Sequence, residues 1–165
     1  MRPLAAALLL LAAAPAAAQP REPVGPYVID VRGATAGLPS DTAFYPGIPL
    51  DTLVPARGFG VDGGGHVYLF ALGPARVGAG ANYVRVRGTA VGIATLVSTV
   101  APQVSFNFGA RDGWSYLSAG IGRAWVDTTV DDGTGPARRE SGAAASVNAG
   151  GGARWFIASH LAVGF

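Results

Sequence analysis

Several segments of the chain alternate apolar and polar residues at a period of two. The clearest segment, residues 103–109, reads QVSFNFG, so Val104, Phe106 and Phe108 share one side and polar residues share the other. Successive side chains of a β-strand point to opposite faces of the sheet, and the pattern therefore predicts a strand with one apolar and one polar face. A polar turn and a second alternating stretch, residues 114–123, complete a predicted hairpin.

The same alternation predicts seven strands. They cover residues 27–34, 59–72, 77–87, a stretch that ends at 109, 114–126, 143–156 and 161–165. Short turns at 73–76, 110–113 and 157–160 alternate with long connections at 35–57, 88–101 and 127–141. This segregation predicts an antiparallel up-and-down membrane β-barrel with short turns at one end and long exposed loops at the other.

Charged residues and a histidine interrupt strands that are otherwise apolar on one face. Charge that faces lipid is unfavourable, so these side chains are predicted to form a polar network inside the barrel. The predicted interior network consists of Asp30, Arg32, Asp62, His66, Arg123 and Arg154. Eight strands enclose an interior that side chains can fill, which favours a filled interior over a conducting channel.

Aromatic residues cluster beside the short turns and at the start of the first strand. Rings of this kind are typical of the membrane–water interface, where one part of the ring is apolar and another is polar. The sequence therefore predicts an aromatic girdle at the turn end of the barrel. Its predicted members are Tyr27, Trp114, Tyr116 and Trp155.

The first residues predict export. Arg2 supplies a positive start, an apolar run of Leu and Ala follows, and Ala16, Ala17 and Ala18 form a small-residue cleavage site. Residues 1–18 are therefore expected to be a cleaved signal peptide, since the apolar run is too short to span about 30 Å of hydrocarbon. Residues 19–26 are expected to be a periplasmic lead, and 27–165 the barrel domain.

Composition narrows the class further. The chain has no cysteine, 25 glycines and 12 basic residues, all of them arginine, with a formal net charge of +2. The absence of cysteine excludes disulfides and thiolate metal sites. The nearly balanced charge gives no reason to expect nucleic-acid binding.

The sequence offers little catalytic or metal-binding chemistry. His66 and His160 are the two histidines, and neither has a second ligand at a metal-binding spacing. Ser159 adjoins His160, but neighbouring strand residues point to opposite faces, so they do not form a nucleophile–base pair. The run at 63–65 lacks the Lys and Ser/Thr of a phosphate-binding loop. We therefore expect no enzyme activity, no metal and no cofactor.

A family resemblance is carried by two blocks. GGGARWF at 150–156 with HLAV at 160–163, and SFNFG at 105–109 with GWSY at 113–116, resemble the small OmpA/OmpX-type barrels of the bacterial outer-membrane β-barrel domain family. The resemblance covers roughly residue 27 to the end. It implies a closed barrel of eight strands and no shared catalytic residues.

The strand count bears on that expectation. Bacterial single-chain barrels have an even number of strands, so seven strands favour a chain that stops early in the seventh, with a loop and an eighth strand lacking. An open barrel of this kind would expose an aggregation-prone edge. In the alternative, Leu161, Val163 and Phe165 form a terminal alternating signal that resembles the assembly signal of these barrels.

These observations lead to one main functional expectation and several alternatives. The main expectation is an integral outer-membrane protein of a Gram-negative-type bacterium with a structural or surface-contact role through its loops. Its expected partners are outer-membrane lipid and, during biogenesis, the barrel-assembly machinery. The alternatives are a narrow pore, a carrier of small hydrophobic molecules, and a soluble periplasmic binding barrel of lipocalin-like shape.

Overall fold

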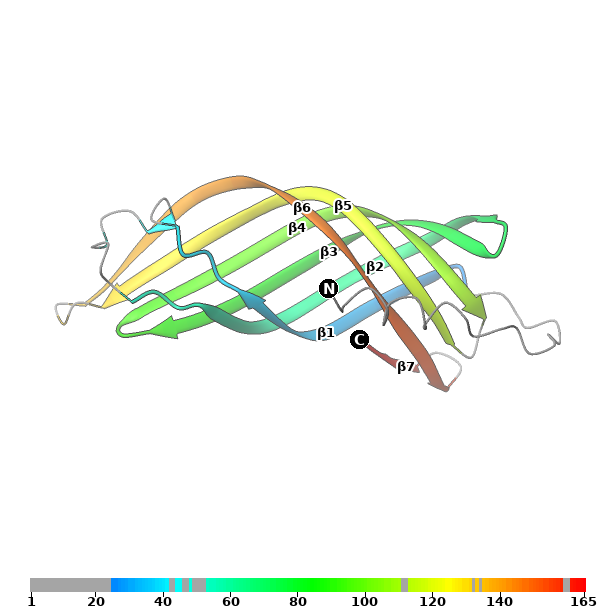
Figure 1. Ribbon diagram of the computed structural model, residues 1–165, viewed down its shortest axis with the longest axis horizontal. Helices are drawn as coiled ribbons and strands as arrows, with labels where there is room; N and C mark the ends of the chain where they lie inside the picture. Colours follow the sequence, from blue (N-terminus) through cyan, green and yellow to red (C-terminus); the bar gives the residue numbers. More distant parts are fainter. Residues whose placement is uncertain are drawn as a thin grey trace, which may run out of the picture.

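A computed structural model describes residues 25–41, 44–45, 48, 53–110, 113–131, 133, 135–158 and 161–165. The predicted signal peptide at 1–18 and most of the predicted lead, residues 19–24, lie outside the described residues. Seven strands in the described part form one antiparallel sheet in sequence order (Figure 1). They are β1 (Tyr27–Gly37), β2 (Arg57–Leu72), β3 (Ala75–Ala90), β4 (Ile93–Ala110), β5 (Gly113–Asp131), β6 (Pro136–Ala158) and β7 (Leu161–Gly164).

The all-β, up-and-down antiparallel fold predicted from the alternation is confirmed. Each strand pairs with its neighbour in sequence, as alternating segments joined by direct connections should. The β2–β3, β4–β5 and β6–β7 connections lie at one end of the sheet, called here the turn end. The β1–β2, β3–β4 and β5–β6 connections lie at the other, called here the loop end (Figure 1).

Two of the three predicted long loops are wrong. β3 and β4 pair up to Ala90 and Ile93, so the segment predicted as a loop at 88–101 is mostly strand. The threonines and serine that interrupt its hydropathy are strand residues, and Thr95 is completely buried. β5 and β6 likewise pair up to Asp131 and Pro136 inside the loop predicted at 127–141. Polar residues at alternate positions of these strands give the two segments a composition that resembles that of a loop.

The sheet curves strongly but is not closed. β7 pairs with β6 only between Arg154 and Ala158, and the described residues show no pairing of β1 with any strand other than β2. Curvature nevertheless brings β1 opposite β5 and β6. The contacts of Asp30 and Arg32 with side chains from those distant strands show this arrangement. The fold is therefore an incomplete barrel with an inner and an outer face.

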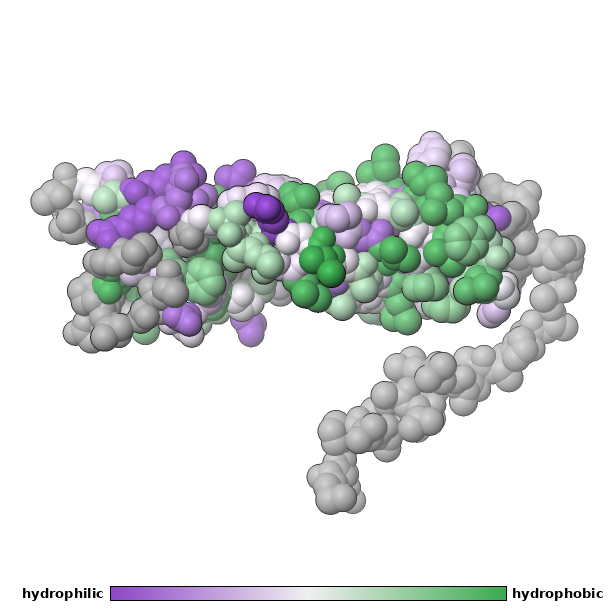
Figure 2. Space-filling view, turned by 90° about the horizontal axis from the view of Figure 1, so that it is seen from above, coloured by the Kyte–Doolittle hydropathy of each residue, from purple (hydrophilic) through white to green (hydrophobic). Residues whose placement is uncertain are grey.

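Burial alternates along much of β1, β3, β4 and β5, and its sense is inverted relative to a water-soluble protein. Large apolar side chains on the outer face are exposed, for example Ile29, Val67, Leu117 and Val147. On the inner face, Asn82, Gln103, Ser105, Asn107 and Arg154 are buried. Hydrophobic side chains gather over the half of the molecule nearer the turn end, and hydrophilic ones toward the loop end (Figure 2).

The described part of the chain has no helix long and apolar enough to cross a membrane.

Candidate functional site: the polar interior

The strongest interaction inside the sheet joins β1 to β6. Asp30 accepts two hydrogen bonds from Arg154, from Nε at 2.8 Å and from NH2 at 2.5 Å, and the two side chains are only 12% and 6% exposed. The Arg154 guanidinium also lies 4.0 Å from the centre of the Tyr116 ring. A bidentate pair and a cation–π contact together neutralise a charge that could not otherwise remain buried.

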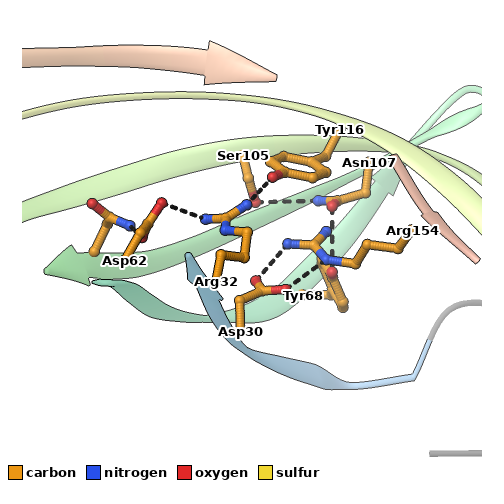
Figure 3. Close-up of polar contacts among 9 residues, drawn as sticks. Asp30, Arg32, Asp62, Tyr68, Ser105, Asn107, Tyr116 and Arg154 are labelled. Carbon is orange, nitrogen blue, oxygen red and sulfur yellow. Dashed lines mark hydrogen bonds and ion pairs between the residues drawn. The ribbon is translucent and has the colours of Figure 1, made fainter. Parts of the chain in front are cut away.

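A second ion pair lies beside the first. Arg32 NH2 is 3.1 Å from Asp62 Oδ2, and the Arg32 guanidinium donates a hydrogen bond to the Tyr116 hydroxyl. Asn82 donates to the other carboxylate oxygen of Asp62. Tyr116 therefore touches both arginines, one through its ring and one through its hydroxyl, and links the two pairs into one network (Figure 3).

Neutral polar groups extend the network toward the turns. Tyr68 donates to Asn107 Oδ1 at 3.3 Å, and Asn107 Nδ2 donates to Ser105 Oγ at 3.1 Å (Figure 3). Asn107 Nδ2 also lies 3.3 Å from the Arg76 carbonyl oxygen, to which it donates. Tyr68 and Trp114 meet edge to face, with ring centres 6.1 Å apart. Aromatic rings and hydrogen-bonded polar groups thus fill the turn end of the interior together.

One cross-strand row shows how glycine makes room for this network. His66, Gly80, Gln103, Gly120 and Asn148 are successive register partners from β2 to β6. Gln103 Nε2 reaches over Gly120 to Asn148 Oδ1 at 2.8 Å. A Cβ atom at Gly120 would lie 2.8 Å from Gln103 Cγ and closer still to the Pro102 carbonyl oxygen. Glycine is needed at position 120 because the Gln103 and Asn148 side chains meet directly over it.

The loop end of the interior is covered by part of the β1–β2 connection. Leu38 and Tyr45 are both buried, and Leu38 N donates to the Ala56 carbonyl at 3.0 Å. The Tyr45 hydroxyl donates to the Pro39 carbonyl at 2.6 Å and lies 3.4 Å from Thr95 Oγ1. Leu38 and Tyr45, in the described part of this connection, therefore lie against the loop end of the sheet near β4.

The structure brings together five of the six residues predicted for the interior. Asp30, Arg32, Asp62, His66 and Arg154 all lie on the inner face. The prediction for Arg123 was wrong: its side chain is exposed on the outer face of β5, in phase with Ile121 and Trp125. Arg123 occupies an outward position of β5 because it lies an even number of residues from Ile121 and Trp125, which face the same way.

The predicted girdle divides in the same way. Tyr27 and Trp155 are exposed on the outer face, as such a girdle requires. The prediction was wrong for Trp114 and Tyr116, which are buried on the inner face and only 6% and 7% exposed. Closeness to a turn does not determine which face a side chain occupies, and both rings share the inward phase of β5.

The sequence reasoning did not single out several members of the network. They are Tyr68, Asn82, Asn107 and Asn148. Their signal was a polar or hydroxyl-bearing side chain at an inward position, and Asn107 had already been assigned to the polar face. What the sequence could not supply was the partner of each one.

A cavity of about 1090 Å³ lies along the free edges of the sheet. β1 lines one side and β6 and β7 the other, with Asp62, Gln103 and Tyr116 among the polar lining residues. Among the residues the structure describes, no cluster of three or more His, Asp or Glu side chains could hold a metal ion. The described interior thus combines two ion pairs and a network of polar side chains with an open cavity.

Comparison of this chain with protein-family models, with curated proteins and with solved structures found no match.

Proposed function

We propose that this protein is an integral outer-membrane β-barrel protein whose role is structural or a surface contact made through the loop end. The observation that carries the proposal is the inverted polarity of the sheet. The outer face exposes large apolar side chains, while the Asp30–Arg154 pair and several amides are buried and the Arg32–Asp62 pair is half-buried. A protein surrounded by water gains nothing from this arrangement, whereas one surrounded by lipid requires it.

The height of the apolar wall supports the same conclusion. On β5 the outward positions Ser115, Leu117, Ala119 and Ile121 carry no charge, and Arg123 comes ten positions after Gly113. Ten residues span about 34 Å along a strand, or about 26 Å along the axis of a barrel whose strands tilt by roughly 40°. The apolar band of outer-membrane barrels is about 25 Å tall.

The interior disfavours two of the alternatives. A soluble lipocalin-like carrier needs an apolar interior and a polar exterior, and this sheet has the reverse. A narrow pore needs a continuous aqueous path, whereas the Asp30–Arg154 pair and the rings of Tyr68 and Trp114 occupy the turn end, and the Arg32–Asp62 pair lies farther along the interior. A membrane location also requires the free edges of β1 and β6 to be paired in the bilayer.

A pair of matched substitutions tests the proposal. Leu117 on the outer wall is 58% exposed, and Leu53 in the first loop is 66% exposed. In lipid vesicles Leu117→Arg should lower the free energy of unfolding by about 2–4 kcal/mol, because the new charge would face hydrocarbon. Leu53→Arg should have little effect. Folding is followed by the heat-modifiable band on a gel and by urea titration.

A soluble protein gives a different result. Leu117→Arg and Leu53→Arg would then be equally tolerated, and the wild-type chain would fold in buffer without detergent. Either observation would overturn the membrane assignment.

A further inference from the structure

Three exposed arginines lie on the outer face of the sheet, toward its loop end. Arg85 and Arg87 lie on β3 and Arg123 lies on β5, all exposed and all in the outward phase of their strands. Arg85 is ten positions beyond Ala75, the first residue of β3, just as Arg123 is ten positions beyond Gly113. Arg85 and Arg123 therefore stand at about the same height above the turn end, about 26 Å by the strand rise and tilt used above.

None of the three has an acidic partner among the described residues. Asp127, which shares a cross-strand row with Arg87 through Leu96, is already 3.1 Å from Arg138. Arg138 is also 3.2 Å from Glu140. The acidic side chains of this region are thus engaged elsewhere, and the wall carries an uncompensated positive charge.

The two arginines at equal height can reach the same ligand. β4 separates their strands, so their Cα atoms are about 12 Å apart from two strand spacings of about 4.8 Å and a two-residue offset. The residue between them on the Arg85 row is Ser98, which is small. Two extended arginine side chains can therefore converge on one anion above Ser98.

The surroundings indicate what kind of anion fits. Tyr83 and Trp125 flank the arginines and are 41% and 38% exposed, as aromatic side chains at a membrane interface commonly are. Immediately toward the turn end lie exposed apolar residues, among them Ile121 and Val100. A ligand held here would have its charge on the arginines and an apolar portion along the wall.

We propose that Arg85 and Arg123, with Arg87 beside them, form a binding site for the phosphate group of an anionic membrane lipid. The acyl chains of the lipid lie against the apolar wall below, and Tyr83 and Trp125 bracket its headgroup. This inference rests on the proposed membrane location. It places a specific lipid contact on the outer face of the sheet, in addition to the surface contact proposed for the loop end.

The test compares lipid retention by three proteins folded in the same zwitterionic detergent. They are the wild type, the double variant Arg85→Gln/Arg123→Gln, and Arg138→Gln, which removes an exposed arginine that already has acidic partners. Each receives equal amounts of phosphatidic acid and acyl-matched phosphatidylcholine, and native mass spectrometry counts the lipids retained. The wild type and Arg138→Gln should prefer phosphatidic acid by at least about tenfold, and the double variant should lose this preference.

Other outcomes overturn the inference in distinguishable ways. An unchanged preference in the double variant would show that the arginines do not form the site. Displacement of the lipid by millimolar inorganic phosphate would identify a free-anion site. A chain that inserts into vesicles with a heat-modifiable band but shows no lipid preference refutes only the lipid site. A chain that fails to insert refutes the membrane proposal and the lipid site with it.

Discussion

Arg154 illustrates how a single charged residue is kept inside this sheet. Its guanidinium is nearly inaccessible to water, and it is stabilised by both oxygens of Asp30 and by the face of Tyr116. Burial of a charge costs several kcal/mol, which a bidentate partner and an aromatic face offset. Removal of one member of the pair should therefore destabilise the protein by more than the intact pair stabilises it.

Substitution of Asp30 measures that penalty. Asp30→Asn should lower the free energy of unfolding in detergent micelles by about 3–5 kcal/mol, because Arg154 would remain buried without a counter-ion. Asp127→Asn is the matched control: it breaks an ion pair with Arg138, whose side chain is 63% exposed, and should cost no more than about 1 kcal/mol. Equal losses in the two variants would show that the interior pair is no more important than a surface one.

At the scale of elements, the β3–β4 hairpin combines tight geometry with an unsuitable residue. Only Val91 and Gly92 separate the strands, and their φ angles are 40° and 76°. Positive φ at both positions is typical of a type I′ turn, which strongly favours Asn-Gly. A β-branched residue at positive φ is strained, so Val91 stores local strain in a hairpin that the neighbouring strand pairs hold in place.

Relief of this strain should stabilise the protein. Val91 is 78% exposed, so Val91→Asn loses little packing and should raise the free energy of unfolding by about 1 kcal/mol. Gly92→Ala should have the opposite sign, since its φ is positive and the added Cβ would lie 2.9 Å from the Asp131 carbonyl oxygen. Chemical unfolding of both variants gives the comparison, and a destabilised Val91→Asn would contradict the type I′ interpretation.

At the scale of the whole molecule, the interior is obstructed at both ends. The Asp30–Arg154 pair and the Tyr68, Trp114 and Tyr116 rings occupy the turn end, the Arg32–Asp62 pair lies farther along the interior, and Leu38 and Tyr45 lie at the loop end. The remaining interior space is the cavity of about 1090 Å³ along the free edges of the sheet. The molecule therefore suits a rigid support for its loops better than a conduit.

This arrangement predicts electrical silence. Wild-type protein reconstituted in planar bilayers should show no steady channel current, provided that a heat-modifiable band first demonstrates folding. Arg123→Ala should leave this silence unchanged, because Arg123 faces outward. Discrete, reproducible conductance steps from folded protein would instead support the narrow-pore alternative.

The sequence by itself determined the class of fold, the number of strands visible in it and the polarity of most positions. Alternation at a period of two is a local property, since successive side chains of any strand point to opposite faces. Together with the rule that charge avoids lipid, alternation placed Asp30, Arg32, Asp62, His66 and Arg154 inside, although the same rule misplaced Arg123. It also placed the short turns correctly, because glycine and polar residues interrupt the alternation there.

Only the tertiary structure decided which residues meet and where the apolar wall ends. Asp30 and Arg154 are 124 positions apart and lie on strands that are not neighbours in the sheet, so their pairing depends on curvature and register. The inward placement of Trp114 and Tyr116, and the outward placement of Arg123, depend on the phase of β5 relative to β4 and β6. Phase and curvature arise from contacts among strands, which no local pattern encodes.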